Sequence, residues 1–278
     1  MQKIILGIKG NLAKALSNYY PNSIQVARSD YIQWPRHTNK LEEFFSKTGV
    51  PPKDCIILNC AGITDIDADL IEMMFINTRL PFYLAEKSVE LGFKLATFGT
   101  VMEQFPKYAK NNQYLNSKLA FFEEYNARED WNKHNVHFQM HTLYGGNNTK
   151  PKMFLGQIYE AINSQTSFSM TGGDQIREYH HIDDVVRAVG DLIEMKISGT
   201  HHISQGNPLK LADLAQAIFN HFNSTQLLNI AAKTADSNDN RHVIFEKPDE
   251  LGGINFREPV EGVISWLQEL GIKNAGKH

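Results

Sequence analysis

The chain lacks the features that would mark a secreted, membrane-spanning or nucleic-acid-binding protein. It has only two cysteines among 278 residues, and its formal net charge is −3. No apolar run approaches the roughly 18–20 residues of a membrane span, and the N-terminus leads into a short β-like run rather than a signal-peptide core. No basic cluster is interleaved with aromatic residues. We therefore expect a cytoplasmic protein that binds neither a membrane nor nucleic acid.

The cysteines and histidines give no sign of a disulfide or a metal site. Cys55 and Cys60 lie in one apolar segment, where an extended strand holds them too far apart for a disulfide bond. We expect both to be core residues of a reduced protein. The histidine pairs at residues 180–181 and 201–202 cannot readily chelate one ion, because neighbouring residues of a strand point to opposite faces. We predict no metal.

In the first half of the chain, short apolar runs alternate with helical patterns. The chain is long enough for a large core and a second lobe, and its apolar content of 42% is ordinary for a globular protein. The expected strands are residues 3–8, 23–27, 54–59, 94–98 and 136–140, and the expected helices are residues 12–19, 41–47, 68–91 and 112–132. Such alternation is typical of a doubly wound parallel α/β sheet.

Beyond residue 146 the elements become shorter. We expect helices at residues 154–164, 183–195, 211–220 and 260–270, strands at 167–170 and 201–204, and a polar loop at 237–240. This part would form a smaller α/β lobe that caps the sheet edge and binds substrate. We therefore divide the chain into a body, residues 1–146, and a lobe, mainly residues 147–278, with segments that return to the body.

A glycine turn follows the first strand. Gly7, Gly10 and Ala13 stand at intervals of three residues and open the first helix. This spacing resembles the turn of dinucleotide-binding proteins, where absent side chains let the backbone approach a pyrophosphate at a helix N-terminus. Ala13 in the third position still allows close packing of helix on strand. A simple strand-to-helix turn is the alternative.

Charged residues after the second strand indicate which dinucleotide would bind. A carboxylate there accepts hydrogen bonds from the ribose 2′-hydroxyl of NAD, whereas an arginine accommodates the 2′-phosphate of NADP. Arg28 and Ser29, with Lys9 in the glycine turn, favour NADP, while Asp30 keeps NAD open. The alternative for Arg28 is an ordinary solvated loop residue.

Small residues end two further strands. Asn59-Cys-Ala-Gly62 ends the third strand, and Gly99-Thr100 follows the fourth. The carboxyl ends of parallel strands meet at one edge, where open α/β sheets bind ligands. We expect a cofactor to lie across this edge.

Tyr114 and Lys118 stand four residues apart on an expected helix and therefore share one face. A tyrosine titrates near pH ~10, so proton transfer near neutrality needs its pKa lowered by roughly 3 units, or about 4 kcal/mol. One ammonium at ~4–5 Å supplies about 3–4 kcal/mol at an effective dielectric of ~20. The spacing indicates a proton-transfer tyrosine, and a surface Tyr/Lys pair is the alternative.

In this order, the motifs resemble the extended short-chain dehydrogenase/reductase family, the NAD(P)-dependent epimerases and dehydratases of nucleotide sugars. Leu143-Tyr-Gly145 resembles the "x-Y-G" after the family's sixth strand. Residues 172–184, G-G-D-Q-I-R-E-Y-H-H-I-D-D, resemble its "G-x-G-x-x-x-R-D-[FY]-x-x-V-x-D" signature. The resemblance covers nearly the whole chain. It implies a dinucleotide-binding Rossmann domain over residues 1–146, a substrate lobe and a possible homodimer.

The resemblance also implies roles for individual residues. Thr100 would bind the reacting oxygen, Tyr114 would exchange its proton, and Lys118 would hold the nicotinamide ribose and lower the pKa of the tyrosine. The residues expected at the cofactor are Gly7, Lys9, Gly10, Asn11, Leu12, Arg28, Ser29, Ala61, Gly62 and Asn77, and those expected at the substrate are Thr64, Glu103 and Arg177. Arg177 would pair with the substrate's pyrophosphate, with a structural salt bridge as the alternative.

The sequence departs from the family pattern after residue 100. The family usually has a small or aromatic residue where Glu103 places a carboxylate, so we expect an unusual substrate pocket. Thr97 is a rival to Thr100, but it precedes the end of the strand and should point into the sheet.

We therefore predict an enzyme that transfers hydride between NADP(H), or else NAD(H), and a ring carbon of a nucleotide-linked sugar. In length the chain is closer to the family's 4-keto reductases than to its 4-epimerases, and a reductase would use Tyr114 as the proton donor. One alternative is a 4-epimerase that retains NAD. Another is a dinucleotide-sensing regulator, which would have no need of a proton donor.

Overall fold

The chain folds into two compact units, in a computed structural model that describes residues 1–37, 39–65, 67–234 and 243–272. The first unit combines Met1–Met140 with Val186–Ile203, and the second combines His141–Val185 with Ser204–His278. The polar loop expected at residues 237–240 lies outside the described residues.

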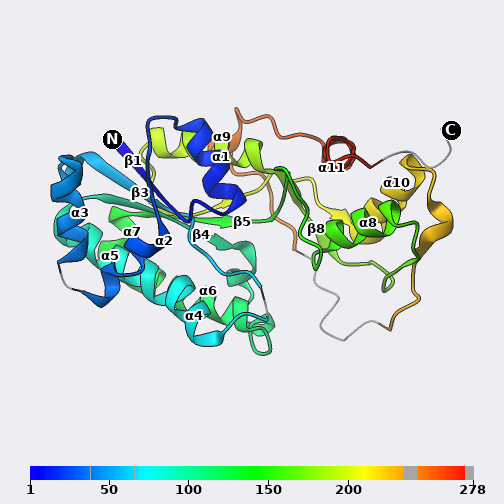
Figure 1. Cartoon of the computed structure of the whole chain (residues 1–278), viewed down its shortest axis with the longest axis horizontal. Coiled ribbons are helices and arrows are strands. Elements are labelled where there is room, and N and C mark those ends of the chain that lie inside the picture. The colour runs from blue at the N-terminus through cyan, green and yellow to red at the C-terminus, as the bar shows by residue number, and fades with distance from the viewer. Residues whose placement is uncertain (38, 66, 235–242, 273–278) are drawn as a thin grey trace. The chain divides into compact units, whose positions relative to one another are not determined.

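Six parallel strands form the sheet of the first unit, in the order β10-β5-β4-β3-β1-β2 (Figure 1). Their bounds are Gln2–Leu6 for β1, Ile24–Val26 for β2, Cys55–Asn59 for β3, Lys94–Thr100 for β4, Val136–Met140 for β5 and Gly199–Ile203 for β10. β3 and β5 are buried along their whole length, as expected where helices cover both faces of a parallel sheet. The predicted doubly wound α/β class is confirmed.

Helices cover both faces of this sheet. Figure 1 shows α1 and α9 on one face and α5, α6 and α7 on the other. The helical bounds are Asn11–Tyr19 for α1, Arg28–Tyr31 for α2, Lys40–Thr48 for α3, Leu70–Met74 for α4, Leu80–Leu91 for α5, Gln113–Ala127 for α6, Glu129–His134 for α7 and Ile182–Glu194 for α9. The ring of Tyr19 in α1 packs closely on Gly190 in α9. A Cβ on Gly190 would lie only 2.5 Å from Cε1 of that ring.

Two expected helices are interrupted. The segment expected as one helix at 68–91 consists of α4, a π-helical stretch η3, Phe75–Arg79, and α5. Pro81 explains the interruption, because it has no N–H to offer the carbonyl four residues earlier and is tolerated only in the first turn of α5. The helix expected at 112–132 divides at Arg128, whose extended backbone ends α6 and begins α7.

Each unit has its own hydrophobic core. The core of the first unit packs strand residues such as Ile57 and Leu95 against Trp34, Leu84 and Trp131 from the helices. Both cysteines are free thiols. The core of the second unit is formed largely by side chains of three helices, α8 at Phe154–Asn163, α10 at Leu211–His221 and α11 at Pro259–Glu269.

Three pairs of short strands complete the second unit. β6 pairs with β9 and β7 with β12, both in parallel, whereas β8 pairs antiparallel with β11. Their bounds are Thr142–Tyr144 for β6, Phe168–Ser169 for β7, Ile176–Arg177 for β8, Tyr179–His181 for β9, Leu209–Lys210 for β11 and Leu228–Asn229 for β12. This unit is therefore a smaller α/β body, as expected.

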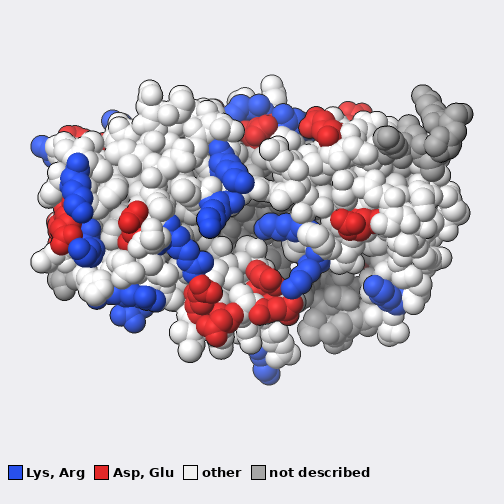
Figure 2. Space-filling view, viewed as in Figure 1, with Lys and Arg blue, Asp and Glu red and all other residues white. Residues whose placement is uncertain are grey.

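Charge on the surface is mixed. On the face shown in Figure 2, Lys and Arg side chains stand in separate groups with Asp and Glu between them. This distribution agrees with the small net charge of −3. Within the described part of the chain, every helix is too short or too polar to cross a membrane.

A buried carboxylate joins two segments of the second unit. Glu178 is fully buried and accepts hydrogen bonds from Ser204 Oγ at 2.7 Å, from the Gln205 N–H at 2.9 Å and from His180 Nε2 at 2.8 Å. Burial works to raise the pKa of Glu178, but the hydrogen bond from His180, with the neighbouring His141 and Ser204, holds this pKa below its ordinary value. The ionised form of Glu178 is thus the one that the fold stabilises.

We expect Glu178→Gln to lower the free energy of unfolding at pH 7 by about 2–4 kcal/mol, because it disturbs a buried charge and its three donors. Since the folded-state pKa is depressed, the stabilisation by Glu178 is present above the ordinary pKa of ~4.3 and is lost as the pH falls through the folded pKa. Urea unfolding between about pH 7 and pH 3 should therefore show a steeper loss of stability in the wild type than in the variant.

The control is Glu194→Gln, whose exposed carboxylate pairs with Lys3 and should contribute about 1 kcal/mol or less. Parallel pH profiles for the wild type and Glu178→Gln would contradict the assignment.

Candidate active site

The glycine turn packs directly on the end of β3. Gly7 has a φ of +79°, and a Cβ there would lie 2.6 Å from the Ala61 nitrogen. The Gly10 N–H donates to the Gly7 carbonyl at 2.8 Å and closes the turn, so that α1 begins at Asn11, with Leu12 beside it. The first N–H groups of a helix have no partner within the helix and bind anions well. This cradle fits the pyrophosphate of a dinucleotide.

Asn77 joins two segments beside this turn. It is buried in η3, where its Nδ2 donates to the Ile63 carbonyl at 2.8 Å and to Ser117 Oγ at 2.9 Å, and its Oδ1 accepts from the Ile63 N–H at 2.9 Å. Ser117 Oγ donates in turn to the Tyr114 carbonyl at 2.7 Å. The amide of Asn77 thereby ties the segment after β3 to the first turns of α6.

A side-chain cap sets the start of α6. Asn112 Oδ1 accepts a hydrogen bond from the Leu115 N–H at 3.0 Å, which satisfies one of the free donors of the first turn. Tyr114 consequently lies in the first turn of α6, and Lys118 lies one turn further on the same face. Both side chains are partly buried.

The ammonium of Lys118 lies close to Gly62 and Asn77, two of the predicted cofactor residues. Its Nζ donates to the Phe98 carbonyl in β4 at 2.9 Å. A Cβ on Gly62 would lie 3.7 Å from Lys118 Nζ and 3.6 Å from Asn77 Oδ1. The structure thus brings Gly62, Asn77 and Lys118 together at the ends of β3 and β4.

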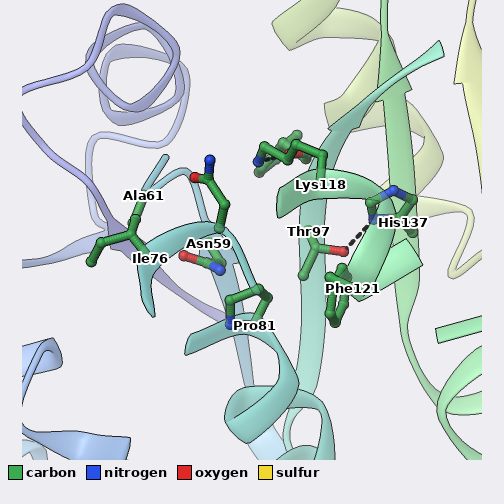
Figure 3. Close-up of a pocket in the computed structure, with 10 residues that line it drawn as sticks. Asn59, Ala61, Ile76, Pro81, Thr97, Lys118, Phe121 and His137 are labelled. Atoms are coloured by element: carbon green, nitrogen blue, oxygen red, sulfur yellow. Dashed lines mark hydrogen bonds between the residues drawn. The ribbon is translucent and has the colours of Figure 1, made fainter. Parts of the chain in front are cut away.

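A small cavity lies among these residues (Figure 3). Its volume is about 10 Å³, which is room for roughly one water molecule. It is lined by Asn59, Ala61, Ile76, Asn77, Pro81, Thr97, Phe98, Lys118, Phe121 and His137. Thr97 Oγ1 lies 2.7 Å from His137 Nδ1, and Thr97 is buried inside the sheet, as its place before the end of the strand suggested.

Glu103 is buried immediately behind Thr100. It lies on η4, a 3₁₀ turn at Val101–Gln104, where its Oε1 accepts from the Thr100 N–H at 3.1 Å. Its Oε2 accepts from His137 Nε2 at 2.9 Å and from Gln139 Nε2 at 3.1 Å. A Cβ on Gly99 would overlap this carboxylate. Protein donors therefore hold both oxygens of Glu103, and the carboxylate fixes the turn that carries Thr100; a contact with substrate stays a prediction.

The expected lowering of the tyrosine pKa is not found. Burial of the phenol, together with the negative charge of Glu103, raises the pKa of Tyr114 above its ordinary value. Burial lowers the pKa of Lys118, while the Glu103 carboxylate and the Cys60 thiol work against that shift. The spacing of Tyr114 and Lys118 indicated that they share a face of the helix. It did not indicate the burial that has the largest effect on both pKa values. Tyr114 therefore carries its proton at neutral pH.

The predicted cofactor-selecting residues lie at the start of α2 rather than in a loop. Arg28 is the first residue of α2, and Ser29 and Asp30 follow it in the first turn. The guanidinium of Arg28 donates to the carboxylate of Glu72 in α4. Lys9 is exposed in the glycine turn.

The predicted substrate residues are divided between the units. Thr64 lies in the first unit, in the segment between β3 and α4. Arg177 ends β8 in the second unit, where its Nη1 donates to the Ile176 carbonyl at 2.7 Å.

Sequence reasoning missed His137, Gln139 and Ser117. The first two had a signal: polar residues alternate along β5, V-H-F-Q-M, although both faces of a central parallel strand are buried. Buried polar side chains need hydrogen-bond partners, so this pattern requires a polar group from another element. Ser117 precedes Lys118 directly, but no spacing identifies it.

The model of the NAD dependent epimerase/dehydratase family matches residues 36–206. This chain belongs to that family. The matched region of this epimerase/dehydratase-family protein includes Gly62, Asn77, Thr100, Tyr114 and Lys118. A comparison with curated protein sequences gave no match.

Solved structures of three different activities share its fold. The dTDP-glucose 4,6-dehydratase of Bacillus anthracis, solved with NAD, is 15% identical, with a TM-score of 0.76 over 96% of this chain and 96% of that one. The dTDP-4-dehydrorhamnose reductase of the same organism, solved with NADP, is 19% identical, with a TM-score of 0.73 over 97% and 99%. The UDP-glucose 4-epimerase of Thermotoga maritima, solved with UDP-glucose, is 16% identical, with a TM-score of 0.75 over 96% and 98%. At these identities the likeness shows the fold alone.

We expect Glu103→Ala to lower the free energy of unfolding by about 3–5 kcal/mol, because it leaves three buried donors without their acceptor. Urea denaturation would measure the change. Glu123→Ala, at an exposed position of α6, is the matched control and should change stability by about 0.5 kcal/mol or less. Similar stabilities for the two variants would mean that Glu103 is solvated rather than buried in this network.

Proposed function

We propose that the protein is a reductase that converts a 4-keto group of a nucleotide-linked sugar to a hydroxyl group, with NADPH as the preferred reductant. The observation that carries this proposal is the placement of Tyr114 one helical turn from Lys118, whose ammonium lies close to Gly62 at the end of β3. The similar dTDP-4-dehydrorhamnose reductase, which matches 97% of this chain and 99% of its own, supports reduction. Reduction of a carbonyl needs a proton donor, whereas the oxidising half of an epimerase cycle needs a base at the same position. Membership of the family supports the wider class of reaction.

The residues of the first unit suit the two halves of a dinucleotide. Gly7, Gly10 and the N-terminus of α1 would hold the pyrophosphate. Gly62, Asn77 and Lys118 would lie along the nicotinamide half. The nicotinamide ring, when bound, supplies the hydride.

The chain's own residues manage the proton. Tyr114 donates its phenolic proton to the carbonyl oxygen of the substrate, which becomes the hydroxyl oxygen of the product. The ammonium of Lys118, one helical turn away, then stabilises the phenolate by its charge. The hydroxyl of Thr100 donates a hydrogen bond to the same substrate oxygen, from a turn that Glu103 holds in place.

Positively charged residues bear on the choice of cofactor and substrate. Arg28 and Lys9 support NADPH, as does the NADP in the similar reductase structure, while NAD in the similar dehydratase keeps NADH possible. A nucleotide sugar is supported by the UDP-glucose in the similar epimerase structure. Arg177 would pair with the pyrophosphate of that substrate, a task suited to its planar set of donors.

We expect Tyr114→Phe to lower kcat for NADPH oxidation with a dTDP- or UDP-linked 4-keto-6-deoxyhexose by about 10²–10⁴-fold, because the proton donor is removed. The Kd for NADPH, measured by fluorescence titration, should change by about twofold or less, since the phenyl ring keeps the shape of the site. The control is Tyr83→Phe in α5, which removes a hydroxyl that has no hydrogen-bond partner among the described residues and should leave kcat unchanged.

Other outcomes would point to the other functions. Redox-neutral turnover with a cofactor retained through purification would indicate a 4-epimerase. Dinucleotide binding without turnover of any nucleotide sugar would indicate a sensor. Full activity of Tyr114→Phe would contradict the assignment of the proton donor.

A further inference from the structure

The Arg28–Glu72 ion pair joins the segments on either side of the glycine turn. β1 lies between β2 and β3 in the sheet, and the glycine turn follows β1. α2 directly follows β2, and α4 comes after β3. An ion pair between Arg28 of α2 and Glu72 of α4 therefore spans the carboxyl edge at β1, which is where open α/β sheets bind ligands.

A second cationic contact accompanies this pair. Arg36, in the 3₁₀ turn η1 at Trp34–Arg36 after α2, stacks over the ring of Phe75 with its guanidinium 4.8 Å from the ring centroid. Phe75 opens η3 immediately after α4. Arg36 is thus engaged by an aromatic face, whereas Arg28 is engaged by a carboxylate.

The two side chains are able to separate. Those of Arg28 and Glu72 are 46% and 48% exposed, and exposed ion pairs are weak enough for a ligand phosphate to displace them. The backbone of Glu72 is fixed, because its N–H donates to the Asp69 cap of α4 at 2.8 Å. Only the side chain of Glu72 has to move when Arg28 changes partner.

We propose that Glu72 is a specificity-determining residue for the dinucleotide, because its carboxylate competes with a 2′-phosphate for Arg28 and offers an unphosphorylated 2′-hydroxyl an acceptor. This inference rests on the dinucleotide binding of the proposed function. A 2′-phosphate must displace Glu72 from the guanidinium and then lies near its negative charge. A 2′-hydroxyl meets no such competition. Glu72 therefore lowers the preference for NADPH that Arg28 creates and keeps NADH usable by the same site.

Direct binding tests the inference without any assay of turnover. The Kd values of NADPH and NADH would be measured by fluorescence titration for the wild type, Glu72→Gln, Arg28→Ala and the double variant. We expect Glu72→Gln to lower the Kd of NADPH by about three- to tenfold and to leave that of NADH equal or up to about threefold higher. Arg28→Ala should raise the Kd of NADPH about tenfold or more with little change for NADH.

The double variant and two controls separate competition from a general effect of charge. In the Arg28→Ala background, Glu72→Gln should no longer improve NADPH binding beyond about twofold, because the guanidinium for which Glu72 and the 2′-phosphate compete is absent. Glu43→Gln removes an equivalent exposed glutamate, paired with Lys40 in α3 at 2.7 Å, and should leave both Kd values unchanged. Arg36→Ala should weaken NADPH binding less than Arg28→Ala does.

Distinct results overturn the two proposals. If Glu72→Gln left the ratio of the NADPH and NADH Kd values unchanged, the Arg28–Glu72 ion pair would have no part in cofactor choice. Wild-type protein that binds neither dinucleotide would overturn the proposed function itself, before any variant is compared. Thermal melts of each variant establish that it is folded. Arg28→Lys keeps the charge but loses the planar donor set, so its Kd for NADPH should lie between those of the wild type and Arg28→Ala.

Discussion

The buried amide of Asn77 is the interaction on which the site depends most. The amide bridges backbone groups of the segment after β3 and the hydroxyl of Ser117 in α6, so it links the glycine-rich end of β3 to the helix that carries Tyr114 and Lys118. Asn77 lies in the π-helical stretch η3, and Pro81, which cannot donate a helical hydrogen bond, follows in the first turn of α5.

Lys118 and Glu103 bring charges of opposite sign to the carboxyl ends of β4 and β5. Lys118 bonds to a carbonyl of β4, while Glu103 is held by donors from β4 and β5. The carboxylate of Glu103 and the burial of the phenol both favour the protonated form of Tyr114. The pKa of Tyr114 is therefore raised above its ordinary value, opposite to the lowering that the spacing of Tyr114 and Lys118 suggested.

The sequence predicted the sheet better than the chemistry around it. Apolar runs identified β1 and β3, and small residues marked the ends of β3 and β4, because both signals are local. The breaks around η3 and at Arg128 were missed, since they arise from packing and from hydrogen bonds that a helical pattern does not encode. The partners of Glu103 were also missed. His137 lies on another strand, and only the folded sheet brings it beside η4. Spacing likewise showed that Tyr114 and Lys118 share a face, but desolvation depends on everything that surrounds them.

The path of the chain between its two units has a consequence for synthesis on the ribosome. β10 pairs with β5, yet the whole of His141–Val185, which belongs to the second unit, is made between them. Until residue 203 has emerged, β5 is an edge strand that pairs only with β4, and an edge strand with unpaired backbone groups can recruit other chains. The nascent protein therefore passes through a stage in which its sheet is one strand short, and a truncation before β10 would leave that exposed edge permanently open to aggregation.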